Sequence, residues 1–114
     1  MIDGTSSDYW KLGCIRRAMT SPRPKASSKL LQENDRVIVT EWRLAPGAET
    51  GWHRHSHDYV VVCLTAGKLA AETSTGTIET ELQFGQAYAR PVGVEHNIVN
   101  PGGNEFAFIE VEIK

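Results

Sequence analysis

The residues best suited to chemistry are the four histidines, three of which lie within five positions. His53, His55 and His57 alternate with other residues, and His96 stands alone later in the chain. Side chains two positions apart in a β-strand project from the same face. A regular strand would therefore point the clustered imidazoles in one direction, where two or three of them can bind a transition metal. Such a metal needs a ligand from another strand, and His96 is the remaining histidine.

The competing interpretation is a solvent-exposed strand. Charged and polar residues separate the histidines over residues 53–58, and His96 would then be unrelated to them. One local feature favours the metal site. Pro91 and Gly93 form a Pro-x-Gly turn just before His96, and this turn can swing the segment back toward the first three histidines.

Two spaced patterns resemble the conserved motifs of the cupin superfamily. The first motif is matched by Gly47, His53, His55 and Gly67. The second motif is matched at every specified position by Gly85, Pro91, Gly93, His96 and Asn100. The resemblance covers about residues 36–113 and implies a small β-barrel. It also implies that His53, His55 and His96 hold one metal, with coordination positions left open for substrate, water or dioxygen.

The chain departs from this family pattern at one ligand. The first motif carries a glutamate where this sequence has Tyr59 or Val60, and neither is a carboxylate. Three interpretations stay open: a three-histidine site resembling the ferrous site of some cupin dioxygenases, including thiol dioxygenases; a fourth ligand from His57 or Tyr59; or a cupin that has lost its metal and only binds a small molecule. His57 would face water if it lies at the barrel rim. Tyr59 shares the parity of the histidines. It could equally donate a hydrogen bond to a metal ligand or act as a general acid, and in the second role it is our candidate catalytic residue.

Four further residues are candidates for lining a substrate pocket: Trp42, Tyr88, Arg90 and Phe108. The guanidinium of Arg90 would suit a carboxylate substrate, because its fork matches carboxylate geometry. The alternative is an exposed arginine at the end of a strand. Trp42 and Phe108 also suit a hydrophobic core.

The elements that must position these residues are strands. Gly, Pro and Asn interrupt the chain roughly every 8 to 12 residues, and no stretch shows helical periodicity, which is typical of an antiparallel sandwich or barrel. We expect strands over residues 37–44, 52–64, 68–73, 77–82, 86–90, 97–99 and 106–113. The fold class is therefore all-β. Together with the resemblance, this predicts a single small antiparallel β-barrel of the jelly-roll type over residues 30–114. Residues 1–29, rich in Ser and Pro near their end, form an N-terminal arm that could cross to a neighbouring subunit.

Composition excludes several classes of function. The chain has 114 residues, with 12 Lys and Arg against 14 Asp and Glu, so no basic surplus points to nucleic acid. The longest apolar run, residues 60–64, is far shorter than the roughly 20 residues of a membrane span. No secretory signal is recognisable, so we expect a cytoplasmic protein with Cys14 and Cys63 as free thiols.

These observations predict a metal-dependent enzyme. We expect one divalent transition metal per subunit, preferably iron, with manganese, nickel, zinc or copper as alternatives. The substrate would be a small organic acid or amino-acid-derived metabolite, and the reaction a dioxygenation by preference. The resemblance extends to small bacterial cupins named for β-alanine degradation. The alternative is a cupin that binds or senses a small molecule without turnover. Exposed sheet edges and apolar outer faces favour a homodimer.

Overall fold

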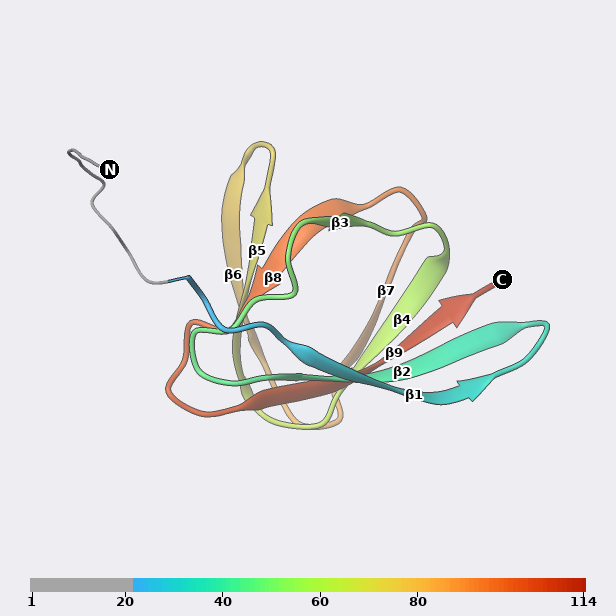
Figure 1. Cartoon of the computed structure of the whole chain (residues 1–114), viewed down its shortest axis with the longest axis horizontal. Coiled ribbons are helices and arrows are strands. Elements are labelled where there is room, and N and C mark those ends of the chain that lie inside the picture. The colour runs from blue at the N-terminus through green and yellow to red at the C-terminus, as the bar shows by residue number, and fades with distance from the viewer. Residues whose placement is uncertain (1–21) are drawn as a thin grey trace.

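The computed structural model describes residues 22–114, which fold into strands joined by turns (Figure 1). The strands are β1 (Ser27–Glu33), β2 (Val37–Leu44), β3 (His53–Arg54), β4 (Asp58–Cys63), β5 (Gly67–Thr73), β6 (Gly76–Leu82), β7 (Ala87–Arg90), β8 (Glu95–Val99) and β9 (Phe106–Ile113). No helix in these residues is long and apolar enough to cross a membrane.

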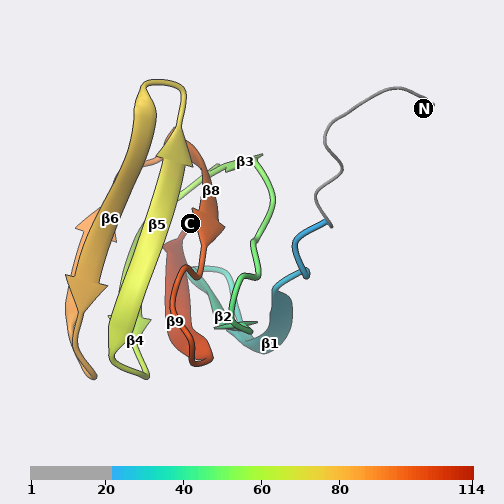
Figure 2. The same cartoon turned by 90° about the vertical axis from the view of Figure 1, so that its left-hand side faces the viewer.

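The strands form two antiparallel sheets that face each other. The larger sheet has the order β1-β2-β9-β4-β7, and the smaller one has the order β3-β8-β5-β6. Figure 2 shows β5 and β6 of the smaller sheet standing opposite β9, β2 and β1 of the larger sheet. This arrangement confirms the predicted all-β jelly-roll class. Within residues 22–114, no strand ladder joins the two sheets, so the barrel is not fully closed.

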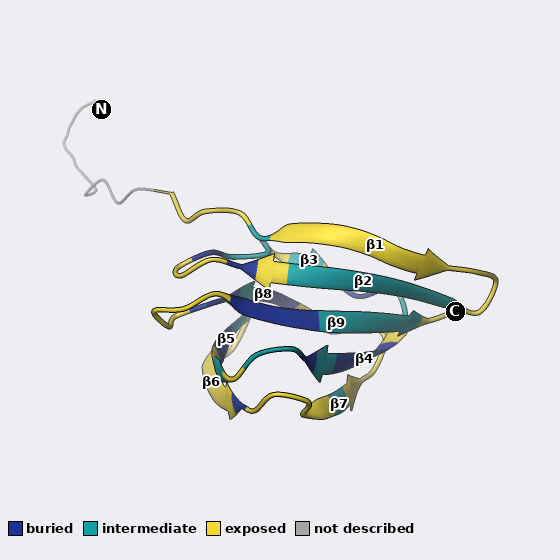
Figure 3. Ribbon diagram, turned by 90° about the horizontal axis from the view of Figure 1, so that it is seen from below, coloured by how far each residue is buried: buried dark blue, intermediate teal, exposed yellow. Residues whose placement is uncertain are grey.

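The hydrophobic core lies between the sheets. Alternation along β4 explains how it forms: Tyr59, Val61 and Cys63 are buried, whereas the intervening Val60 and Val62 are only half-buried. Other buried members are Leu44, Ala48, Leu69, Leu82, Phe106 and Phe108. Figure 3 shows the buried first half of β9 in the middle of the larger sheet and β1 exposed along its edge. Cys63 therefore packs in the core as a free thiol.

One expected strand is interrupted in the structure. The prediction of a continuous strand over residues 52–64 is wrong, because the chain leaves the smaller sheet after β3 and enters the larger sheet at β4. The backbone of His55 is held at this crossing: His55 N–H donates to the Val94 carbonyl (2.8 Å), and the Gly93 N–H donates to the His55 carbonyl (2.8 Å). The crossing therefore lies at the second histidine of the first sequence motif, between β3 of the smaller sheet and β4 of the larger one.

The N-terminal boundary also differs in detail from the sequence expectation. Ser27–Glu33 forms β1, which pairs with β2, so residues 27–29 of the expected arm belong to a strand. Residues 1–21, which make up most of that arm and include Cys14, lie outside the described part of the chain.

Candidate metal centre

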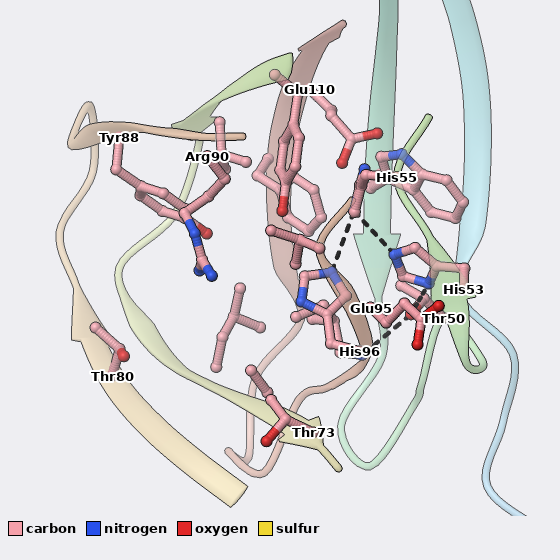
Figure 4. A pocket seen from close by; sticks show the side chains of 18 of the residues that line it. Thr50, His53, His55, Thr73, Thr80, Tyr88, Arg90, Glu95, His96 and Glu110 are labelled. Carbon is pink, nitrogen blue, oxygen red and sulfur yellow. Dashed lines mark hydrogen bonds between the residues drawn. The ribbon is translucent and has the colours of Figure 1, made fainter. Parts of the chain in front are cut away.

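Three of the four histidines meet at one end of the space between the sheets. His53 in β3 and His96 in β8 are direct cross-strand partners, and His55 follows β3 at the crossing between the sheets. The Nε2 atom of His55 lies 3.1 Å from His53 Nε2 and 3.1 Å from His96 Nε2. Figure 4 shows the three imidazoles pointing toward one another. His55 and His96 are buried, and His53 is half-buried.

The spacing of these nitrogens fits a metal ion. Metal–imidazole bonds of about 2.0–2.1 Å place two ligand atoms about 2.9 Å apart at a right angle and about 3.4 Å apart at the tetrahedral angle. The observed separations of 3.1 Å lie between these values. The three histidine side chains can therefore hold a divalent metal.

The protonation states also fit a metal. The pKa of both His55 and His96 is lowered to about 4, chiefly by burial and also by the charges of neighbouring histidines and of Arg90. Both rings are thus neutral near pH 7. His53 Nδ1 lies 2.8 Å from the Gly51 carbonyl, which only accepts hydrogen bonds, so Nδ1 carries a proton; in the neutral ring Nε2 then keeps its lone pair.

Hydrogen bonds among the rings cannot satisfy this cluster. A single hydrogen on His55 Nε2 can point directly at only one of its two neighbouring nitrogens. Because His53 Nε2 carries no hydrogen in the Nδ1-protonated tautomer, at least one of the two close nitrogen–nitrogen contacts is not a hydrogen bond. A cation placed among the three lone pairs removes this conflict, which is a second reason that the cluster suits a metal.

His57 and Tyr59 occupy different surroundings. His57 lies outside the cluster, half-buried beside the exposed Ser56, 3.4 Å from its Oγ. The Tyr59 ring is buried and stacks on the His55 ring, with centroids 3.8 Å apart and planes 15° apart. Burial raises the pKa of Tyr59 to about 12, so its phenol is neutral and can donate a proton or a hydrogen bond. The structure thus places Tyr59 against His55 and places His57 outside the histidine cluster.

Two carboxylates that the sequence did not identify as site residues face the same cavity. Glu110 and Glu112 lie on β9, and Glu112 is the cross-strand partner of Tyr59. Ligand atoms of His55, Glu110 and Glu112 all lie within 4.8 Å of one another. The pKa of Glu110 is raised to about 7, chiefly by burial and also by the Glu112 charge, while a hydrogen bond with Trp42 acts in the opposite direction. The carboxylates near the histidines therefore come from β9, and not from Tyr59 or Val60, where the first cupin motif carries its glutamate.

A cavity of about 730 Å³ extends from the histidines toward β6 and β7. All four residues that the sequence suggested for a substrate pocket line it: Trp42, Tyr88, Arg90 and Phe108. Figure 4 shows Tyr88 and Arg90 across the pocket from the histidines. Arg90 is exposed and is the cross-strand partner of Tyr59. The cavity therefore offers a cationic group, two carboxylates and three imidazoles to one small ligand.

Comparison with known proteins gives consistent results. The model of the cupin domain matches residues 40–112. The beta-alanine degradation protein BauB of Pseudomonas aeruginosa is 56% identical over 94 residues, which cover 82% of this chain and 99% of BauB. The crystal structure of a cupin domain from Bordetella pertussis Tohama I has a TM-score of 0.81 and 54% identity, covering 83% of this chain and 99% of that one. The polyketide cyclase RemF of Streptomyces resistomycificus, at 21% identity, has a TM-score of 0.65 and covers 82% of this chain and 70% of its own, which indicates a shared fold.

Proposed function

The chain belongs to the cupin family, and from this premise we propose that it is a metal-dependent enzyme acting on a small amino-acid-derived metabolite. The observation that carries the proposal is the convergence of three imidazoles at the end of an accessible cavity. His53, His55 and His96 would hold one divalent metal, and we propose iron. A bound metal of this kind supplies Lewis acidity or a redox centre at its open coordination positions.

The charged groups of the cavity support a substrate that carries both signs of charge. Arg90 can bind a substrate carboxylate through two parallel hydrogen bonds. Glu110 and Glu112, on β9, can receive an ammonium group nearer the histidines. An amino acid or a close derivative has both groups, and the name of the relative BauB refers to the degradation of such a compound, β-alanine. We therefore propose a small amino acid of this type, or a product derived from it, as the substrate class.

Two residues would act on the bound substrate directly. The neutral phenol of Tyr59, stacked on His55, can donate a proton to a substrate oxygen that faces the ligands. Arg90 orients the other end of the substrate. Apolar side chains of the cavity, including Val61, Leu69 and Phe108, exclude water from the space between these two groups.

Metal analysis tests the metal centre. Protein purified without a histidine tag and supplied with Fe²⁺ is expected to retain near-stoichiometric metal. The variants His53→Ala and His96→Ala are expected to lose it. His57→Ala is the matched control, because it removes a histidine of the same segment that lies outside the cluster. Equal and low metal content in all four proteins would contradict the proposal.

Oxygen uptake and product analysis test catalysis. The iron-loaded protein is assayed with β-alanine, other small amino acids, their keto-acid derivatives and small thiols. Arg90→Ala is expected to raise KM for carboxylate substrates more than it lowers kcat, since it removes a binding contact. Tight binding of a compound without oxygen uptake or any product across the panel would favour a binding protein over an enzyme.

A further inference from the structure

A polar cluster lies on the opposite side of β8 from the cavity. It consists of Arg23, Glu49, Glu72 and Asn97, none of which lines the cavity. Asn97 follows the ligand His96 in β8, so its side chain projects from the other face of the strand. Only 8% of Asn97 is exposed, and a buried amide of this kind needs a partner for each of its polar atoms.

The Asn97 amide is satisfied in one orientation only. Its Nδ2 group donates to Glu49 Oε1 (2.8 Å) and to Glu72 Oε1 (3.0 Å), while its Oδ1 accepts from the Gly51 N–H (2.9 Å). The opposite orientation would set Oδ1 against two carboxylates and the amide group against an N–H. Glu49 and Glu72 therefore hold Oδ1 toward Gly51.

Gly51 connects Asn97 to His53 through two hydrogen bonds. The same residue that donates its N–H to Asn97 uses its carbonyl to accept from His53 Nδ1 (2.8 Å). Its φ of 89° lies in the left-handed region, which glycine adopts without strain. The contacts thus run from Asn97 to Gly51 and from Gly51 to His53. His53 is thereby kept in the form whose Nε2 lone pair faces the other ligands.

Arg23 stabilises the arrangement in which Glu49 and Glu72 both accept hydrogen bonds from the Asn97 side-chain amide. Its guanidinium donates to Glu72 Oε1 (3.1 Å) and Oε2 (2.9 Å) and to Glu49 Oε1 (3.1 Å), which offsets the repulsion between the two carboxylates. The N-terminal segment is also fixed by its backbone. The Glu49 N–H donates to the Pro24 carbonyl (2.9 Å), and the Ala26 N–H donates to the Glu49 carbonyl (2.8 Å).

We propose that Asn97, held by Glu49, Glu72 and Arg23, is a positioning residue that fixes His53 as the Nδ1-protonated tautomer and so prepares Nε2 for the metal. The role of the metal rests on the proposed function. The assignment of the His53 tautomer does not rest on the proposed function, because the tautomer can be measured in the metal-free protein. The segment of residues 23–26 would then help to position His53 through Arg23.

The first experiment measures the tautomer by ¹⁵N NMR of the histidine rings in the metal-free protein. His53 is expected to be protonated on Nδ1 in the wild type and to shift toward the Nε2-protonated form in Asn97→Ala and Arg23→Ala. Arg43→Ala is the matched control. The side chain of Arg43 is 45% exposed and forms ion pairs with Glu41 and Glu105. The side chain of Arg23 is 42% exposed and forms ion pairs with Glu49 and Glu72. Unlike Arg23, Arg43 belongs neither to the polar cluster nor to the cavity lining.

The second experiment measures Co²⁺ affinity by absorption spectroscopy with a competing chelator. Loss of a residue that orients a ligand typically weakens metal affinity by about 10- to 100-fold, which is the change expected for Asn97→Ala. Arg23→Ala is expected to weaken it less, and Arg23→Lys to restore part of the loss because the positive charge is kept. Arg43→Ala is expected to match the wild type.

Three results would overturn the inference: an unchanged His53 tautomer in both Asn97→Ala and Arg23→Ala, equal effects of Arg23→Ala and Arg43→Ala, or a wild-type His53 protonated on Nε2. If Asn97→Ala does not fold, the comparison of the two arginine variants decides the matter. A wild-type protein that binds no Co²⁺ would contradict the proposed function instead, while the tautomer comparison would still decide the role of Asn97.

Discussion

Replacing Glu110 by glutamine should change how the stability of the metal-free protein depends on pH. Glu110 faces the cavity from β9, and its surroundings raise its pKa from 4.5 to about 7. Burial is the largest cause, because it disfavours the charged carboxylate, and the neighbouring Glu112 charge acts in the same direction. A shift from 4.5 to about 7 corresponds to about 3 kcal/mol between the two protonation states.

The sign of the effect follows from proton linkage. In the wild type the folded state holds this proton more tightly than the unfolded state does. The contribution of Glu110 to the free energy of unfolding is therefore complete below pH 4.5 and is lost as the pH rises through about 7. Glutamine has no proton to lose, so Glu110→Gln should not show this loss. The variant should be more stable than the wild type by up to about 3 kcal/mol near pH 8, relative to their difference near pH 4.5.

Urea denaturation followed by circular dichroism, in excess EDTA and across this pH range, provides the assay. The quantity of interest is the difference between wild type and variant at each pH, because other groups that titrate contribute equally to both proteins. Glu79→Gln, on the exposed β6, is the control for loss of one surface carboxylate. A difference that stays constant between about pH 5 and about pH 8 would refute the reasoning, since the burial of Glu110 requires it to change.

Three further predictions concern the site and its supports. Because burial lowers the pKa of His55 and His96 to about 4, the neutral rings stabilise the metal-free protein above pH 6.5. This contribution should be lost as the pH falls through about 4, which would lower the urea midpoint of unfolding. His96→Gln should show a smaller loss. Asn100→Ala removes hydrogen bonds to the Leu44 and Asn104 carbonyls and to the Gly102 N–H, so it should cost about 2–4 kcal/mol in chemical denaturation while leaving the His53 tautomer unchanged. Gly51→Ala forces a residue with a Cβ to a φ of 89°, so it should cost about 1–2 kcal/mol and also weaken Co²⁺ binding; wild-type stability and affinity would show that this turn does not support His53.

The histidine positions illustrate how far the sequence could predict the site. Spacing and the cupin resemblance brought His53, His55 and His96 together, and the structure places their Nε2 atoms in one cluster. Strand parity did not settle the position of His57, because parity holds only while the chain stays in one strand. The crossing between β3 and β4 ends the first strand at Arg54, and beyond it the direction of each side chain depends on backbone contacts with residues far along the chain.

The carboxylates of β9 show a different limit. Alternation over residues 106–113 separates Glu110 and Glu112 from an apolar face, and a simple hydrophobic pattern would turn that apolar face inward. The structure turns the glutamates toward the cavity and leaves Ile109 and Val111 half-buried on the other side. Period-two patterns define two faces of a strand, but which face is interior depends on the rest of the fold. β1 was missed for a related reason: it is exposed along its whole length, so pairing with β2, and not a hydrophobic pattern, defines it.

The pairing of His53 with His96 also has a consequence for the order of folding. The two residues are about 40 positions apart, and β3, which carries one of them, is only two residues long. A strand of this length cannot hold its place until β8 has docked on β5, whereas the β5–β6 hairpin needs only local contacts. Metal capture during refolding should therefore follow formation of the β5–β6 hairpin, and the kinetics of metal uptake would report the docking of β3 on β8.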